Sequence, residues 1–169
     1  MALSRPFQLN LKKSSLVDLL KGLITLFQEE ADSLNIKLVT DIDPGLPLIE
    51  MDEEKLTQGF INIMKNGMQS MERGGILRIE AHILRDDVEV NISDTGTGIL
   101  PNQMEKIFNY YYTTKEKGAG LGLPIAHRIV EAHRGQLIVD SQVGVGTKMT
   151  VRLPIRGKEN PRSNTGSTQ

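Results

Sequence analysis

Two runs of alternating apolar residues constrain the fold most. Residues 77–83 and 88–92 each place every second side chain on one face, and the polar residues Arg85, Asp86 and Asp87 lie between them. Alternation with a period of two is typical of a half-buried strand, and a short polar turn between two such runs predicts an antiparallel hairpin. The chain should therefore contain a sheet whose apolar face other elements must cover.

Two amphipathic helices are predicted ahead of this hairpin. The first begins after Ser15, with Asp18 three residues on in the manner of a capping box. Its apolar stripe at helical spacing consists of Leu16, Leu19, Leu20, Leu23, Phe27, Ala31 and Leu34. Asp52 is a favourable N-cap for the second helix, which we expect to end near Arg73, just before a pair of glycines.

The remaining periodic segments complete an α+β fold. Further strands are predicted at residues 7–11, 36–42, 136–141 and 148–155, and further helices at residues 102–108 and 123–133. The pattern predicts a two-layer sandwich, in which helices cover one face of a mixed, mainly antiparallel sheet. The other face would be left to solvent or to a partner.

Composition indicates one soluble domain and excludes several classes of function. With 169 residues, 38% of them hydrophobic, one core is expected over residues 7–155, between a stub at 1–6 and a disordered tail at 156–169. The 20 basic and 21 acidic residues are scattered, so no nucleic acid partner is expected. Cysteine is absent, and the sequence shows neither a membrane-spanning apolar run nor a signal-peptide pattern.

The second helix carries a stripe of three amides. Gln58, Asn62 and Asn66 follow one another at intervals of four residues, which places them on one face of the helix. Amide oxygens are neutral ligands that Mg²⁺ accepts together with water and phosphate oxygens. The stripe is therefore a candidate Mg²⁺ and phosphate site, although a solvated helix face is the simpler interpretation when the stripe is taken alone.

Residues 93–122 form a polar, glycine-rich region that contains two further motifs. Residues 94–98 (Asp-Thr-Gly-Thr-Gly) come directly off a strand; the carboxylate can accept a hydrogen bond from an exocyclic amine, and the glycines can admit a flat ring. An Asp-Gly turn explains the same residues. The glycines of residues 118–123 lead straight into a helix, which predicts a phosphate cradle or a flexible linker; the chain contains no Walker loop.

The motifs gain meaning from their order along the chain. They are residues 62–66, 94–98, 108–115, 118–123 and 144–147. This series resembles the N, G1, F, G2 and G3 boxes of the histidine kinase branch of the superfamily that also contains gyrase, the Hsp90 chaperones and MutL. The resemblance covers residues 7–155 and implies a Bergerat-type ATP-binding fold with three helices on the sheet. Residues 113–115 (Thr-Thr-Lys) are most similar to nitrogen-regulation-type kinases.

The resemblance implies ATP and Mg²⁺ as cofactors and assigns a role to each matching residue. Asn66 would bind Mg²⁺, with Asn62 near the ion and phosphates, and Asp94 would bind the adenine amine with support from Thr147. The rest of the cofactor-binding set is Gly96, Gly98 and Ile99 at the base, and Lys115, Gly118, Gly120, Leu121, Gly122 and Leu123 at the phosphates. Catalysis is assigned to Asn62, Asn66 and Lys115. Lys65 and Gln69 flank Asn66, and residues 109–120 would form an ATP lid.

Asn62 discriminates among the possible activities. ATP-hydrolysing relatives, and the branched-chain dehydrogenase and anti-sigma kinases, carry Glu there. In the ATPases that carboxylate can activate water, whereas an amide has no useful basicity near neutral pH. The resemblance therefore implies a protein-histidine kinase, with an ATPase or a catalytically silent nucleotide-binding module as alternatives. Two departures bear on the lid: Ala119 replaces a common Thr, which removes one possible phosphate contact, and Asn109-Tyr110 replaces a common Glu-Pro.

The phosphoacceptor histidine is expected outside this chain. His82 lies in the hairpin, while His127 and His133 lie on the last helix, and all three are interpreted as exposed or half-buried polar positions. The implied partners are a separate histidine phosphoacceptor and dimerisation domain and the receiver domain of a response regulator. The resemblance further implies that the isolated domain is a monomer from a homodimeric parent and that it is cytoplasmic, whether or not the parent is anchored in a membrane.

Overall fold

The predicted hairpin lies at the centre of the sheet. The structure is a computed structural model and describes residues 7–114 and 120–156. β4 (Gly75–Leu84) and β5 (Asp87–Asp94) pair antiparallel, with Leu84 opposite Asp87 next to the turn. Arg85 occupies the turn with a φ of 58°, the left-handed conformation that lets two strands reverse within so few residues.

The sheet is mixed and mainly antiparallel, as the sequence predicts. Its five strands follow the order β2 (Ile36–Ile42), β4, β5, β7 (Gly146–Pro154) and β6 (Gln136–Gln142). β2 pairs with β4 in parallel, and the three other neighbouring pairs are antiparallel. This order places β5 and β7, which carry two of the predicted site residues, side by side in the interior of the sheet.

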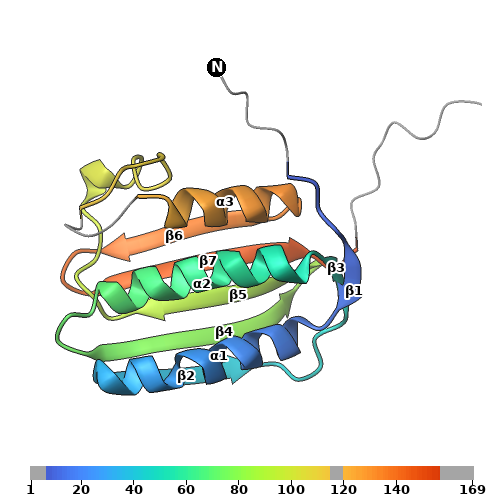
Figure 1. Cartoon of the computed structure of the whole chain (residues 1–169), viewed down its shortest axis with the longest axis horizontal. Helices are drawn as coiled ribbons and strands as arrows, with labels where there is room; N and C mark the ends of the chain where they lie inside the picture. Colours follow the sequence, from blue (N-terminus) through green and yellow to red (C-terminus); the bar gives the residue numbers. More distant parts are fainter. Residues whose placement is uncertain (1–6, 115–119, 157–169) are drawn as a thin grey trace, which may run out of the picture.

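Three helices cover one face of this sheet, so that the molecule has two layers (Figure 1). They are α1 (Leu16–Ser33), α2 (Glu53–Gln69) and α3 (Gly122–Ala132). Both predicted N-caps are present: the Ser15 hydroxyl accepts from the backbone N–H of Asp18, and the Asp52 carboxylate accepts from that of Lys55, each at 3.1 Å. Capping satisfies N–H groups that the first helical turn leaves without a partner.

The core lies between the helices and the sheet. Its largest fully buried side chains include Leu16, Leu20, Ile36, Leu56, Phe60, Ile63, Met64, Leu77, Ile79 and Ile129. The predicted stripe of α1 is buried except for Leu34, which is 43% exposed because it follows the helix as its C-cap. α2 also ends earlier than predicted, at Gln69, where the N–H of Ser70 turns to the carbonyls of Asn66 and Gly67.

The first predicted strand is displaced. β1 (Lys12–Ser14) pairs antiparallel with β3 (Ile49–Met51) in a separate two-stranded sheet, whereas residues 7–11 form no strand. The prediction of a strand at 7–11 was wrong because this segment is held by side chains rather than by a neighbouring strand. The backbone N–H of Asn10 donates to Asp52 Oδ2 at 2.9 Å, and the Phe7 ring packs under Arg128 at 4.5 Å.

The helix predicted at residues 102–108 is also wrong. The structure has a single 3₁₀ turn, η1 (Pro101–Gln103), followed by further turns. The backbone N–H groups of Met104, Lys106 and Asn109 each donate to the carbonyl three residues earlier, a spacing that does not sustain a long helix. Among the described residues, no helix has the length and apolar character needed to cross a membrane.

Candidate functional site

Asp94 lies at the end of β5 and its carboxylate is held by the backbone on both sides. Oδ1 accepts hydrogen bonds from the N–H of Gly96 at 2.9 Å and from the N–H of Thr147 at 3.2 Å. Thr147 is the residue opposite Asp94 in the β5–β7 register. Two backbone donors on one oxygen fix the orientation of a carboxylate, because a strand end and a tight turn cannot rotate as a side chain can.

The loop after Asp94 is wedged between the end of α2 and the β6–β7 turn. A side chain on Gly96 would collide with Ser70, and one on Gly98 would collide with the carbonyl of Gln142. Gly98 also has a φ of 75°, a conformation that favours glycine. These close approaches explain why both positions are occupied by glycine. They also place the loop after Asp94 directly against the β6–β7 turn.

The amide stripe of α2 adjoins two other predicted motifs. Asn62 and Asn66 are half-buried, whereas Gln58 is exposed, so the interpretation as a solvated face describes Gln58 alone. A Cβ added at Gly122 would lie 3.7 Å from the Cβ of Asn62, and one added at Gly67 would lie 3.4 Å from Oδ2 of Asp94. The stripe therefore runs along the Asp94 loop and the start of α3.

The glycine loop leads directly into α3. Gly120 has a φ of 69°, and its carbonyl accepts from the N–H of Tyr111 at 2.9 Å. No side chain among the described residues caps the α3 N-terminus, where Leu121 is the N-cap and Gly122 and Leu123 begin the helix. Free first-turn N–H groups favour an anion. Lys115, Gly118 and Ala119 lie outside the described residues, as do 1–6 and nearly all of the predicted tail.

Ser141 lies in the candidate site, although no motif in the sequence includes it. Its Oγ lies 2.8 Å from Oγ1 of Thr147 and accepts from the N–H of Ile99 at 2.9 Å. It also lies opposite Thr147 in the β6–β7 register. Ser141 can be identified only from the pairing of β6 with β7, because the alternation of residues along a single strand carries no information about that pairing.

The three histidines differ in their surroundings. His82 is exposed, and half-buried His127 stacks on Phe108 with ring centroids 4.6 Å apart, so the interpretation as polar positions holds for both. It was wrong for His133, which is only 6% exposed. Burial lowers the pKa of His133, although the Ile129 carbonyl and the Asp52 carboxylate act in the opposite sense.

Two carboxylates have lowered pKa values for structural reasons. Burial raises the pKa of Asp52, but hydrogen bonds from the N–H groups of Asn10 and Lys55 outweigh it, so the net pKa lies below its ordinary value. The pKa of Glu89 is lowered chiefly by its hydrogen bond from Arg152, whose Nε lies 2.9 Å from Oε2. Both carboxylates therefore serve as structural acceptors.

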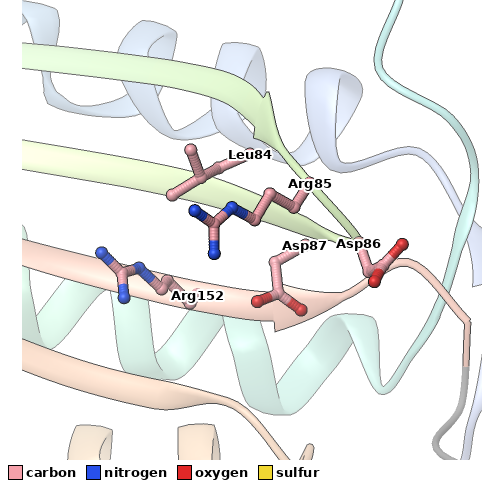
Figure 2. A pocket seen from close by; sticks show the side chains of 5 residues that line it. All are labelled: Leu84, Arg85, Asp86, Asp87 and Arg152. Atoms are coloured by element: carbon pink, nitrogen blue, oxygen red, sulfur yellow. The ribbon is translucent and has the colours of Figure 1, made fainter.

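A hollow of about 380 Å³ lies at the other end of the hairpin. Its lining residues are Leu84, Arg85, Asp86, Asp87 and Arg152 (Figure 2). β5 begins at Asp87 in this hollow and ends at Asp94 in the candidate site, so the two lie at opposite ends of one strand. The arginines are accompanied by two aspartates, and Arg152 is already paired with Glu89, so this hollow is unsuited to a polyphosphate.

Comparison with known proteins identifies the family. Residues 51–157, more than half of the chain, match the family of histidine kinase-, DNA gyrase B-, and HSP90-like ATPases. The chain belongs to this family, as the five motifs indicate.

The similar proteins identify the branch. Sporulation kinase E of Bacillus subtilis (strain 168) is 31% identical over 163 residues, which cover 96% of this chain and 22% of that protein. The sensor histidine kinase ZraS of Escherichia coli (strain K12) is 35% identical over 153 residues, which cover 90% of this chain and 33% of ZraS. The chain thus spans a fifth to a third of these two relatives.

Solved structures agree in both fold and extent. Full-length ShkA, crystallised with AMPPNP, has a TM-score of 0.82 at 27% identity, over 94% of this chain and 34% of ShkA. The catalytic domain of the histidine kinase ThkA has a TM-score of 0.79 at 26% identity, over 87% of this chain and 97% of that domain. The chain is the ATP-binding catalytic domain of a two-component sensor histidine kinase.

Proposed function

We propose that this domain binds ATP and Mg²⁺ at the end of the sheet where β5, α2, the start of α3 and the β6–β7 turn meet. It then transfers the γ-phosphate to a histidine of a separate phosphoacceptor and dimerisation domain. The observation that carries the proposal is the convergence of the motifs. Asp94 is fixed by two backbone N–H groups, and Gly67 and Gly122 bring the Asn66 and Asn62 face of α2 beside it.

Adenine would bind beside Asp94, at the end of β5. The carboxylate accepts hydrogen bonds only, so it suits the exocyclic amine of adenine. Gly96, Gly98 and Ile99 would line the base pocket, and the Thr147 hydroxyl would support the contact. The tight packing around Gly98 supports this assignment, because it gives the pocket a rigid wall against which a flat ring can lie.

The triphosphate would extend along α2 toward α3. Asn66 is the proposed Mg²⁺ ligand, with Asn62 one helical turn earlier near the phosphates; the half-buried amides fit an ion that takes few protein oxygens. When bound, Mg²⁺ neutralises charge on the transferred phosphate. Gly120, Leu121, Gly122 and Leu123 would surround the phosphates through backbone N–H groups, and the proposal extends to Lys115 and Gly118.

A kinase fits this site better than an ATPase. The position one turn before Asn66 carries an amide in Asn62, which cannot activate water as a carboxylate can. A neutral histidine is already an adequate nucleophile, so the domain needs only to position the γ-phosphate and neutralise its charge. The relative ZraS, which is named a sensor histidine kinase, supports the same choice. A response regulator receiver domain is the proposed later acceptor of the phosphate.

The direct test is phosphotransfer in trans. The purified domain is incubated with γ-labelled ATP and Mg²⁺, with and without the isolated phosphoacceptor domain of the parent kinase. We expect an acid-labile, base-stable label on the phosphoacceptor domain and none on the catalytic domain itself. ATP turnover without any added protein would instead favour the ATPase, and nucleotide binding without transfer would favour the silent binding module.

A further inference from the structure

Ser141 occupies the centre of the hydrogen bonds at the base end of the site. Its Oγ lies 2.9 Å from the backbone N of Ile99, 2.8 Å from Oγ1 of Thr147 and 3.2 Å from the carbonyl oxygen of Gly146. β6 places Ser141 opposite Thr147, and β7 places Thr147 opposite Asp94. Three neighbouring strands thus present Ser141, Thr147 and Asp94 in one row.

The Ser141 hydroxyl makes hydrogen bonds to three groups. A serine hydroxyl has one proton and two lone pairs, and the N–H of Ile99 donates to one lone pair. The proton has two candidate acceptors, Thr147 Oγ1 at 2.8 Å and the Gly146 carbonyl at 3.2 Å. The first distance is the usual length of an O–H···O hydrogen bond, and the second lies beyond the usual range. Whichever hydroxyl donates in the Ser141–Thr147 hydrogen bond, the bond holds the Thr147 side chain against β6.

We propose that Ser141 is a positioning residue for nucleotide binding, which holds the Thr147 hydroxyl and the Ile99 end of the Asp94 loop in place beside the base. This inference rests on the proposed function. With one hydrogen bond to Ser141, Thr147 Oγ1 keeps further hydrogen-bonding capacity for the base, directly or through a bridging water.

The same hydroxyl also anchors the loop that lines the base pocket. The hydrogen bond from the Ile99 N–H ties the end of the loop after Asp94 to β6. Removing the Ser141 hydroxyl would release both Ile99 and the Thr147 hydroxyl at the same time. Both consequences fall on the base, and neither reaches the phosphate end of the site.

A double-mutant cycle on ADP affinity tests the role, with Ser141→Ala and Thr147→Val as the two single changes. Losing one hydrogen bond predicts that Ser141→Ala weakens ADP binding about five- to tenfold. Because Ser141 acts through Thr147, the same change should have little further effect in the Thr147→Val background. Adenosine should lose as large a factor as ADP, since the two share the base, and Ser141→Thr should restore affinity.

Thr150→Val is the matched control. It removes a hydroxyl from the same pair of strands, one that donates to Asn91 Oδ1 at 2.7 Å, and it should lower the melting temperature without changing ADP affinity. Additive losses in the cycle, unchanged ADP affinity in Ser141→Ala, or an equal loss of affinity in Thr150→Val would each overturn the positioning role. If the wild-type domain bound no ADP, the proposed function would fail, and this inference with it.

Discussion

Nε2 of His133 accepts a hydrogen bond from the backbone N–H of Asp52 at 3.0 Å, which joins the end of α3 to the N-cap of α2. On the other side of the ring, Nδ1 lies 2.7 Å from the carbonyl oxygen of Ile129 and so carries the proton. The imidazole is therefore neutral, with one nitrogen as donor and the other as acceptor. The two helices that flank the candidate site are tied to each other at the end of α2 away from Asn66.

This arrangement predicts a pH-dependent stability. The folded pKa of His133 is lowered by burial, so at pH values between the folded and unfolded pKa the unfolded chain binds a proton that the folded chain does not. The free energy of unfolding should therefore fall as the pH is lowered from about 7.5 to about 5.5, around the unfolded histidine pKa. Asp52 and Glu89, whose pKa values are lowered from carboxyl values, lose their contributions only at more acidic pH.

Urea unfolding at a series of pH values measures this contribution. In His133→Gln the amide oxygen can still accept from the N–H of Asp52, but the side chain at this position no longer titrates. The free energy of unfolding should therefore depend less steeply on pH than in the wild type. His127→Gln, on the same helix, removes a half-buried imidazole and is the matched comparison for the loss of a histidine. Equal slopes in the wild type and His133→Gln would show that the buried imidazole is not the titrating group.

Asp94→Asn should abolish nucleotide binding and leave the fold intact. The Asn oxygen can still accept from the N–H groups of Gly96 and Thr147, but an amide donor then faces the adenine amine. We expect ADP affinity to fall about a hundredfold or more, because a charge-assisted hydrogen bond is lost and an unfavourable contact replaces it. The melting temperature is measured alongside, with Asp140→Asn on an exposed position of β6 as control. Unchanged ADP affinity would refute the adenine assignment.

Gly98→Ala should destabilise the domain through the backbone. The position has a φ of 75°, and a methyl group there would collide with the Gln142 carbonyl. The expected loss is about 2 kcal/mol or more in the free energy of unfolding. Gly22→Ala is the opposite case: it lies in α1 with open space around a new Cβ, and should stabilise by about 0.5–1 kcal/mol. Similar effects in the two variants would contradict this account of the Asp94 loop.

Much of the fold follows from local signals in the sequence. Ser15 and Asp52 cap helices where the capping pattern predicts, and Arg85 turns the hairpin between two runs of strict alternation. Such signals depend on neighbours within a few residues. β3 escaped prediction because it has three residues and exists through pairing with β1, far away in the chain.

The candidate site shows the same difference between local signals and contacts between distant segments. Asp94 and Asn66 could be proposed as site residues from the sequence because each belongs to a motif that is recognisable over a few residues. Ser141 could not, since its place in the candidate site depends on lying opposite Thr147 on the neighbouring strand. His133 likewise looked like an ordinary polar position on the last helix, and its burial arises from the docking of α3 against the residue that caps α2.

Asn66→Asp tests the metal assignment separately from the adenine assignment. A carboxylate in place of the amide adds a negative charge beside the phosphates and alters the charge balance of the ion site. We expect ADP binding to lose its dependence on Mg²⁺ and phosphotransfer in trans to fall at least about tenfold. Gln58→Glu, a similar change at the exposed end of the same stripe, should have little effect. Normal transfer by Asn66→Asp would count against Asn66 as the ligand.

The measurement that tests the central claim most directly is calorimetric titration of the purified domain with ADP and a non-hydrolysable ATP analogue, with and without Mg²⁺. The account predicts saturable, one-to-one binding that Mg²⁺ strengthens and that Asp94→Asn removes. Absence of binding at millimolar nucleotide would contradict it, and would mean that the converging motifs at the end of β5 serve the fold alone.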